Sequence, residues 1–119
     1  MYIPKALLRK VYVKGSMQAT EDGLVFKLKN ILASATLNAP VKVFVDGVEV
    51  EPENIELEID GKKIKALEIS SENPLDFPLG RELIVVVKGS YEKGKHKVVL
   101  EASIRGYGKG KIEIEDEAQ

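Results

Sequence analysis

The sequence contains no cysteine and no tryptophan. Without cysteine the chain cannot form disulfides, Cys-ligated zinc sites or iron–sulfur clusters. No apolar run approaches the ~20 residues of a membrane-spanning helix. The segment Met1 to Lys14 also lacks the uninterrupted apolar stretch and small-residue cleavage site of a signal peptide. We therefore expect a cytoplasmic protein that does not enter a membrane.

Positive and negative charges nearly balance: 18 basic and 19 acidic residues are mixed along the chain, and the net charge is −1. Because nucleic-acid binding depends on a concentration of positive charge, this balance disfavours a nucleic-acid partner. The length of 119 residues suits one domain, residues 1–119, with its own hydrophobic core. Many Lys and Glu residues with few Met are typical of a thermophile protein, although compositional scatter gives the same pattern.

Two Asp-Gly pairs, Asp46-Gly47 and Asp60-Gly61, interrupt alternating apolar runs. Two-residue Asp-Gly loops suit the type I′ turn, in which both central residues need φ > 0. The chain from Val41 to Ile69 is therefore predicted to form two hairpins. The expected cross-strand pairs are Val45–Val48, Val43–Val50, Leu57–Ile64, Ile55–Ala66, Glu58–Lys63 and Glu56–Lys65.

Short alternating runs with turn residues between them continue along the rest of the chain. We predict about seven or eight strands with turns about every 8–12 residues, which indicates an immunoglobulin-like antiparallel β-sandwich. A short helical turn is expected within Pro4–Tyr12, before the strands. After Ala66 the apolar phase shifts by one residue, which predicts a bulge or a strand end there.

The sequence also predicts the structure of four further segments. Val11–Ala19 is predicted to be the first strand and Ser70–Gly80 the longest loop. Leu83–Val87 is nearly all apolar, as expected of a central strand buried on both faces. The acidic tail Glu113–Gln119 is expected to fray.

Few residues have the pattern of a catalytic or metal site. His96 is the single histidine and lies between two lysines, so we expect an exposed imidazole without a partner. The glycine-rich segment Gly106–Gly110 is interpreted as a hairpin turn, because no helix follows to form a phosphate site. We therefore expect no catalytic residue, no cofactor, no metal and no enzymatic activity of the chain alone.

Alternating strand directions place the longer loops and the N-terminal segment at one end of the sandwich. Functional contacts on such scaffolds concentrate where loops gather. We therefore expect Met1–Val13 and the Phe77 loop to contact another subunit. The alternative is that the N-terminal segment folds back onto the core of its own domain. The expected contact residues are Tyr2, Ile3, Leu7, Leu8, Tyr12, Asp76, Phe77 and Tyr107.

Three segments resemble one known family. Val43–Ile55 reads V-F-V-D-G-V-E-V-E-P-E-N-I, Phe77–Gly80 reads F-P-L-G, and Tyr91–Val98 reads Y-E-K-G-K-H-K-V. In this order and spacing they are similar to the small β subunit of C-glycoside deglycosidases, over about Gly23–Ile104. The resemblance implies a β-sandwich accessory subunit bound to a larger barrel subunit that carries the metal and the chemistry, and it brings no catalytic residue to this chain.

These observations lead to a hypothesis of a non-catalytic β-sandwich interaction module. Its expected role is an accessory subunit of a larger sugar-acting enzyme, or a homo-oligomer. The alternative is a carbohydrate-binding sandwich, which is disfavoured because sugar sites stack rings on aromatic side chains, and the sequence has three Phe, four Tyr and no Trp. The expected partners are thus a protein or a second copy, with carbohydrate as the alternative.

Overall fold

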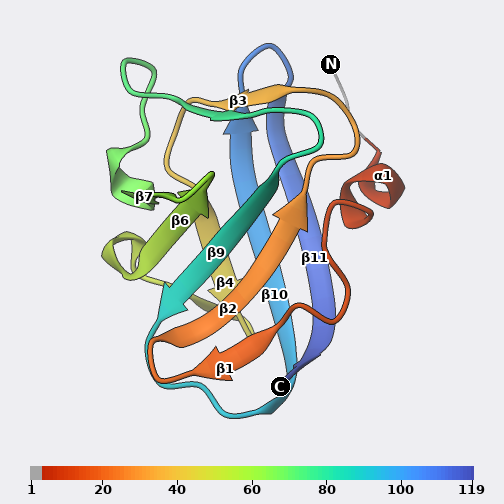
Figure 1. Ribbon diagram of the computed structural model, residues 1–119, viewed down its shortest axis with the longest axis vertical. Helices are drawn as coiled ribbons and strands as arrows, with labels where there is room; N and C mark the ends of the chain where they lie inside the picture. Colours follow the sequence, from red (N-terminus) through yellow and green to blue (C-terminus); the bar gives the residue numbers. More distant parts are fainter. Residues whose placement is uncertain (1–3) are drawn as a thin grey trace.

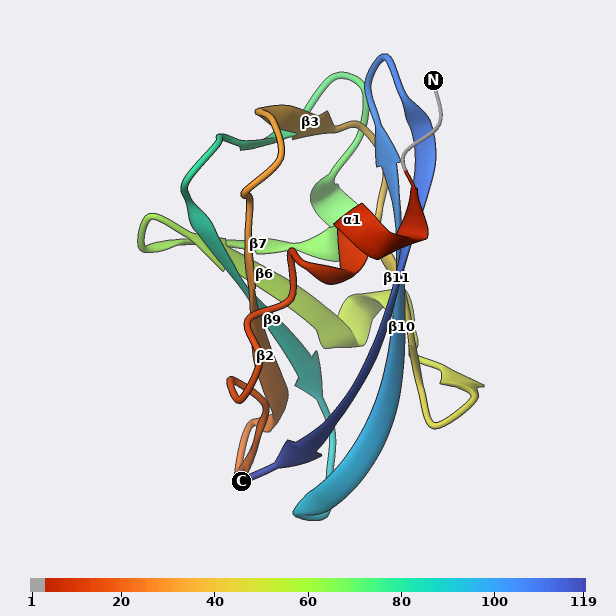
Figure 2. The same cartoon turned by 90° about the vertical axis from the view of Figure 1, so that its right-hand side faces the viewer.

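Two antiparallel sheets packed face to face form the core of this computed structural model, which describes residues 4–119 (Figures 1 and 2). The predicted all-β sandwich with a short N-terminal helix is confirmed. The elements are α1 (Lys5–Arg9), β1 (Gln18–Thr20), β2 (Gly23–Lys29), β3 (Ala35–Leu37), β4 (Lys42–Val45), β5 (Val48–Glu49), η1 (Pro52–Asn54), β6 (Ile55–Ile59), β7 (Lys62–Lys65), η2 (Ala66–Glu68), β8 (Leu75–Phe77), β9 (Glu82–Lys88), β10 (Gly94–Ile104) and β11 (Gly108–Ala118).

The strand order explains why the sandwich is immunoglobulin-like. One sheet has the order β1-β2-β9-β6-β7. In the other sheet β11 pairs with one edge of β10, while β4 and β3 pair with the opposite edge. The orders β1-β2-β9-β6 and β4-β10-β11 correspond to the A-B-E-D and C-F-G sheets of immunoglobulin constant domains.

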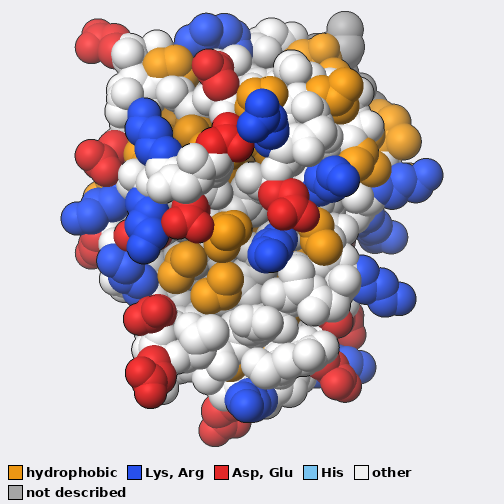
Figure 3. Space-filling model, in the orientation of Figure 1, with side chains coloured by type: hydrophobic (Ala, Val, Ile, Leu, Met, Phe, Trp, Pro, Cys, Tyr) orange, Lys and Arg blue, Asp and Glu red, His pale blue; other side chains and the backbone are white. Residues whose placement is uncertain are grey.

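The inner faces of β2 and β9 supply much of the core. Leu24, Phe26 and Leu28 of β2 are buried, as their alternation predicts. The prediction that β9 is buried on both faces is wrong, because Ile84 and Val86 are only half-buried. Figure 3 views this sheet face-on and shows hydrophobic side chains among charged ones. β-branched residues fit a pleated surface even when it is partly exposed, so composition alone did not reveal the open face.

Both Asp-Gly hairpins form as predicted. The φ angles are +50° at Asp46 and +85° at Gly47, and +51° at Asp60 and +79° at Gly61. The observed register pairs are Val45–Val48, Leu57–Ile64, Glu58–Lys63 and Glu56–Lys65. Val50 N–H donates to the Val43 carbonyl at 2.8 Å. Ile55 and Ala66 do not pair, because Ala66 begins the 3-10 turn η2 at the predicted end of the strand.

The first strand is shorter than predicted. Val11–Ala19 is interrupted by Gly15, which has φ +85°, and by a turn in which Ser16 N–H donates to the Val13 carbonyl. What remains is an isolated bridge between Tyr12 and Leu28, followed by β1. The predicted loop Ser70–Gly80 likewise contains a short strand, β8, which pairs with β3.

The prediction that the C-terminal tail frays is wrong. β11 pairs with β10 from Gly108 to Ala118. Its inward residues Ile112, Ile114 and Ala118 are buried, so an acidic outer face coexists with an apolar inner face. Gln119 then donates its N–H to the Met17 carbonyl at 3.0 Å, which ties the chain end to the segment before β1.

The helix α1 lies beside β11 and crosses the gap between the two sheets on one side of the sandwich (Figure 2). Leu8 of α1 and Val11 after it are buried, whereas Leu7 faces outward. For Lys5–Val13 the packing thus follows the alternative in which the segment covers its own core. Within residues 4–119, no helix is both long and apolar enough to cross a membrane.

Candidate functional site

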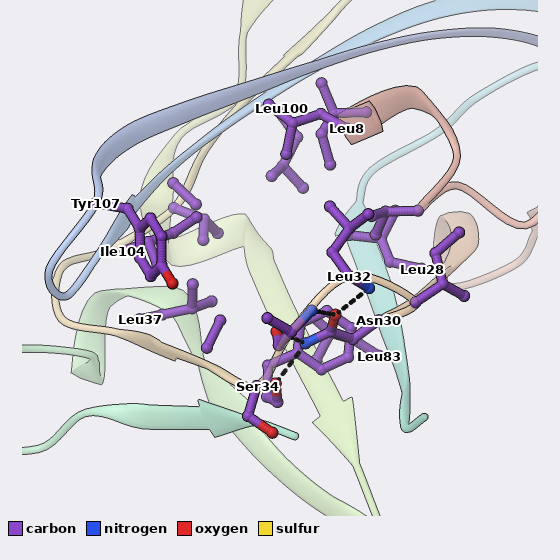
Figure 4. A pocket seen from close by; sticks show the side chains of 18 of the residues that line it. Leu8, Leu28, Asn30, Leu32, Ser34, Leu37, Leu83, Leu100, Ile104 and Tyr107 are labelled. Atoms are coloured by element: carbon purple, nitrogen blue, oxygen red, sulfur yellow. Dashed lines mark hydrogen bonds between the residues drawn. The ribbon is translucent and has the colours of Figure 1, made fainter. Parts of the chain in front are cut away.

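An apolar cavity of about 340 Å³ opens at the end of the sandwich that carries α1 and β3. Its walls come from both sheets, from α1, and from the segment that links β2 to β3 (Figure 4). Buried aliphatic residues such as Leu28, Leu83, Leu100 and Ile112 line its interior. Concave, mostly apolar spaces of this size are typical of binding sites in proteins.

Asn30 holds the segment that forms one wall of this cavity. Its Nδ2 donates to the carbonyls of Ala33 and Phe77, each at 2.7 Å. Its Oδ1 accepts N–H bonds from Leu32 at 3.1 Å and Ala33 at 3.3 Å. Since an amide side chain has two N–H donors and one carbonyl acceptor, these bonds use each polar atom of the buried Asn30. Its role is to shape the wall of the cavity.

Two further hydrogen bonds fasten the Phe77 loop to this wall. Ser34 Oγ accepts the N–H of Leu79 at 3.0 Å. Thr36 Oγ1 donates to Asp76 Oδ1 at 3.0 Å, across the β3–β8 pair. Asp76 is thus held on the exposed side of the β3–β8 pair, while Phe77, its neighbour, faces the core.

Four of the residues expected to contact a partner meet at this cavity: Leu7, Leu8, Phe77 and Tyr107. Leu8 and Phe77 are buried, and Tyr107 is half-buried at the turn between β10 and β11. Tyr12 lies elsewhere, and Tyr2 and Ile3 are outside the described residues. Whether these residues contact a partner stays a prediction.

Exposed aliphatic side chains surround the opening of the cavity. Leu7 is 41% exposed and Ile31 is 47% exposed, and both line the cavity. Leu79, 55% exposed, adjoins it through its bond to Ser34. We call Leu7, Ile31 and Leu79 the apolar rim. Ile31 and Leu79 were not expected as contact residues, because single aliphatic residues in loops carry no recognisable sequence signal.

The single histidine is part of a polar contact at the surface, in which the imidazole is largely covered and its partner Asp46 is exposed. The His96 side chain is only 11% exposed. Its Nδ1 lies 2.7 Å from Asp46 Oδ2 and its Nε2 lies 2.6 Å from the Glu92 carbonyl oxygen. Both neighbours are acceptors, so the doubly protonated imidazolium satisfies both bonds. The prediction of an exposed, unpartnered imidazole is therefore wrong.

The same contact raises the pKa of His96 and lowers the pKa of Asp46. The Glu92 carbonyl, followed by the Asp46 carboxylate, raises the pKa of His96 above its ordinary value. The N–H of Lys97, followed by the His96 imidazole, lowers the pKa of Asp46. Each charged form is stabilised by its partner, which is typical of a structural contact.

A second, half-buried pair fastens the N-terminal segment to β11. Tyr12 donates its hydroxyl to Asp116 Oδ2 at 2.7 Å, and Gly15 N–H donates to the same oxygen at 2.8 Å. Burial, together with the Asp116 carboxylate, raises the pKa of Tyr12 to about 12. The Tyr12 hydroxyl in turn lowers the pKa of Asp116. This places Tyr12 in a structural role.

Metal ligands do not gather in the part of the chain that the structure describes: no group of three or more His, Asp or Glu residues could hold an ion there. The residues with shifted pKa values are the two pairs described above and Tyr91, whose ring packs edge-on against His96, and none of them lines the cavity. The arrangement at the cavity is therefore suited to apolar contact rather than to acid–base chemistry.

Comparison with protein families matches residues 7–119 to the family described as hydroxymethylglutaryl-CoA reductase, N-terminal domain. Because the match extends over nearly all of the sequence, the chain belongs to this family. No curated protein matches the chain.

The resemblance to the small β subunit of C-glycoside deglycosidases is therefore wrong. The segment Val43–Ile55 that carried it is a hairpin around Asp46-Gly47 followed by the turn η1. Tyr91–Val98 is the end of the loop after β9 followed by the first part of β10, which begins at Gly94. Such turn-and-strand patterns recur in unrelated β-sandwiches, so their similarity says little about the family.

Proposed function

We propose that this chain is a non-catalytic β-sandwich module that binds the catalytic part of a hydroxymethylglutaryl-CoA reductase through the apolar rim. The family description supports the choice of partner, since it names an N-terminal domain of that enzyme. The role of an accessory module is thus kept from the sequence-based hypothesis, with a reductase in place of a sugar-acting enzyme.

The observation that carries this proposal is the apolar rim itself. Leu7, Ile31 and Leu79 come from three segments far apart in the sequence and expose their side chains. Leu7 and Ile31 line the cavity, and Leu79 adjoins it through its bond to Ser34. Covering apolar surface contributes about 25 cal/mol for each Å² removed from water. Exposed apolar patches on soluble domains commonly mark protein contacts.

The surroundings of the cavity support a non-catalytic role. Asn30 and Ser34, two polar side chains at its wall, already bond to backbone atoms. Catalysis of a hydride transfer or a proton transfer needs polar groups that converge on a substrate. His96 and Tyr12, whose pKa values are raised, bond instead to carboxylates of neighbouring strands and turns.

The carbohydrate-binding alternative gains no support from the described residues of the Phe77 loop. Phe77 is buried, and sugar rings need an exposed aromatic face on which to stack. A second copy of the chain is a partner that the same rim could accept. Its association is measured in the experiment that follows.

The proposal is tested by mixing the purified chain with the separately expressed catalytic part of a reductase from the same organism and measuring the mass by light scattering after gel filtration. We expect a complex that the double variant Leu7→Asp/Ile31→Asp loses. Val48→Asp is the matched control, since Val48 is 69% exposed on the hairpin between β4 and β5, away from the rim.

Three outcomes contradict the proposal. The wild-type chain fails to bind the reductase, or the double variant binds as well as Val48→Asp does. In the third outcome the chain alone forms a dimer that the double variant abolishes, while the reductase has no effect. That result assigns the rim to self-association.

A further inference from the structure

The outer face of the sheet β1-β2-β9-β6-β7 is open to contact. In Figures 1 and 2, no helix or strand of residues 4–119 lies over it. The side chains that alternate with the core along β2, β9 and β6 point to this face, because successive residues of a strand point to opposite sides. We call the set at its middle the open sheet face: Val25, Lys27, Glu56, Glu58, Ile84 and Val86.

The centre of the open sheet face is apolar. Val25 of β2 lies in register with Val86 of β9, and Ile84 lies two residues before Val86 on the same side of β9. All three side chains are half-buried, with no more cover than their neighbours on the sheet provide. In Figure 3, hydrophobic side chains lie in the middle of this face and charged ones surround them. An apolar centre within a charged border is the composition of a protein contact.

The charges beside this centre are sorted by strand. The outer residues of β2 after Val25 are basic, Lys27 and Lys29, whereas those of β6 are acidic, Glu56 and Glu58. β2 pairs with one edge of β9 and β6 pairs with the other edge. The register places Lys27 and Glu58 at the same level, on either side of Ile84. The open sheet face is therefore positive on one side of β9 and negative on the other.

Lys27 and Glu58 are available to charges of another molecule. Within residues 4–119, neither forms an ion pair within 4.0 Å, although Lys63 of β7 lies in register with Glu58. Glu56, in contrast, lies 3.6 Å from Lys88. Lys27 is exposed and Glu58 is half-buried. The two charges on either side of Ile84 are thus those that a partner would meet without a close ion pair of their own.

This arrangement is complementary to a second copy of itself. A two-fold axis parallel to β9 turns the face over, so that β2 of one copy lies over β6 of the other and β9 lies over β9. Lys27 of each copy then meets Glu58 of the other, and Ile84 and Val86 meet their own counterparts across the axis. A two-fold axis perpendicular to the strands places β2 over β2 and β6 over β6, which brings like charges together.

The charges at the two ends of β9 lie near the axis and face their own counterparts. Each has a neighbour of opposite sign on its own sheet: Lys88 has Glu56 at 3.6 Å, and Glu82 has Lys29 in register. Such neighbours reduce the repulsion between like charges across the axis.

We propose that the chain forms a homodimer through the open sheet face, with the two-fold axis parallel to β9. At about 4.8 Å between strands and about 3.3 Å per residue, five strands and the seven residues of β9 give a face of about 24 by 23 Å. Two such faces bury roughly 1,000 Å², which is at the lower end of specific interfaces, so we expect a dissociation constant of about 10⁻⁵ M. This inference goes beyond the proposed function and does not depend on a reductase partner.

The first test is sedimentation of the full 119-residue chain over a range of about 1–500 µM, which brackets the expected constant. We expect the mass to rise from 13.1 kDa towards twice this value. Val86→Asp places a charge in the apolar centre and should weaken the dimer at least about tenfold. Val48→Asp is the matched control, because Val48 is 69% exposed in the other sheet. The rim variant Leu7→Asp/Ile31→Asp should dimerise as the wild type does.

Exchange of charges tests the direction of the axis, at side chains that are exposed or half-buried. Lys27→Glu alone and Glu58→Lys alone each oppose like charges, so each should dimerise at least about tenfold more weakly. An equal mixture of the two single variants restores opposite charges at both contacts, and we expect heterodimers with an affinity close to that of the wild type. The control is Glu101→Lys, since Glu101 is half-buried in the other sheet and also lies in register with lysines.

The mixture also separates loss of contact from loss of fold, because an unfolded variant does not regain a partner. The proposal is overturned if the wild-type chain stays monomeric up to about 500 µM, fifty times the expected constant. A dimer that Val86→Asp and Lys27→Glu both leave intact overturns it as well. If both single charge variants lose the dimer and their mixture does not recover it, the axis parallel to β9 is wrong. A dimer abolished by Leu7→Asp/Ile31→Asp but not by Lys27→Glu belongs to the apolar rim and refutes the assignment to this face.

Discussion

The imidazole Nδ1 of His96 lies 2.7 Å from Oδ2 of Asp46, a residue 50 positions earlier in the chain. Asp46 occupies the first position of the turn between β4 and β5, with φ +50°. Its second carboxylate oxygen accepts the N–H of Lys97 at 2.9 Å, and its own N–H donates to the Lys97 carbonyl at 2.8 Å. One side chain thus joins a hairpin turn to the beginning of β10.

The first prediction concerns the stability that this contact provides. His96→Ala leaves the Asp46 carboxylate and the Glu92 carbonyl without their partner, so we expect the free energy of unfolding at pH 6 to fall by about 1–2 kcal/mol. Lys95→Ala is the control, because the side chain of Lys95 forms an exposed ion pair with Glu115, and the substitution should change the free energy of unfolding by less than about 0.5 kcal/mol. Urea unfolding measures both. Equal stability of the two variants would refute the structural role of His96.

The second prediction is the pH dependence of the same contact. The raised pKa of His96 means that the folded state binds the proton more tightly than the unfolded state. Its contribution is fully present below the ordinary pKa of about 6.5 and is lost as the pH rises through the raised folded value. The lowered pKa of Asp46 gives a contribution that is present above the ordinary value of 3.8 and is lost as the pH falls through the lowered folded value.

The stability difference between the wild type and His96→Ala should therefore be largest at about pH 5–6 and should shrink as the pH rises past about 7. Urea unfolding curves across this range measure it. A difference that stays constant from about pH 5 to pH 9 is incompatible with a charged imidazole in the fold.

The third prediction concerns the hairpin turns. Gly61 has φ +79° and open space where a Cβ would lie, so backbone strain alone opposes a side chain there. Gly61→Val should destabilise by about 1 kcal/mol or more, since β-branched residues are strained at positive φ. Gly61→Asn should cost less, because Asn adopts this conformation more readily. Melting temperatures that do not separate the two variants argue against the turn geometry. The same comparison applies to Gly47, with φ +85°.

The fourth prediction concerns the wall of the cavity. Asn30→Ala removes the four hydrogen bonds that the side chain makes and leaves the Phe77 carbonyl, which is bonded in the interior, without this partner. We expect a loss of about 2 kcal/mol or more in the free energy of unfolding. Asn73→Ala is the control, because the exposed Asn73 bonds to the Glu68 carbonyl at the surface and should cost less. If Asn30→Ala and Asn73→Ala lower the free energy of unfolding by the same amount, Asn30 does not hold the wall of the cavity.

Local patterns in the sequence were sufficient to predict the hairpins. The Asp46-Gly47 and Asp60-Gly61 turns fix their own register, because the loop length and the sign of φ determine which residues face each other. The sandwich followed from the number and spacing of alternating runs. The residues of β2 that face the core, Leu24, Phe26 and Leu28, were predicted from their alternation with polar and half-exposed residues.

Contacts between distant segments were beyond these patterns. His96 bonds to Asp46, and the Asp46-Gly47 turn was by itself a sufficient reason for an aspartate at that position. Nothing in the sequence therefore indicated that the two side chains meet. A last strand was expected around Ile112 and Ile114, but the acidic character of the tail concealed its continuation to Ala118, whose side chain is buried. The strand β8 was missed because two prolines flank its three residues.

The candidate site could be predicted only in outline. Alternating strand directions indicated which loops share an end, and Leu7, Leu8, Phe77 and Tyr107 do meet there. The cavity itself depends on how far apart the two sheets stand beneath α1, which no local pattern encodes. Neither Asn30 nor Ile31 therefore had a signal to distinguish it from an ordinary loop residue.

Hydrogen–deuterium exchange of the chain, measured with and without the catalytic part of the reductase, tests the proposed partner contact most directly. If the apolar rim binds the reductase, amides of residues 5–10, 31–34 and 79–81 should exchange more slowly in the mixture, while those of residues 46–49 should be unchanged. Unchanged exchange at the rim with a saturating amount of reductase, or protection confined to other surfaces, would contradict the account.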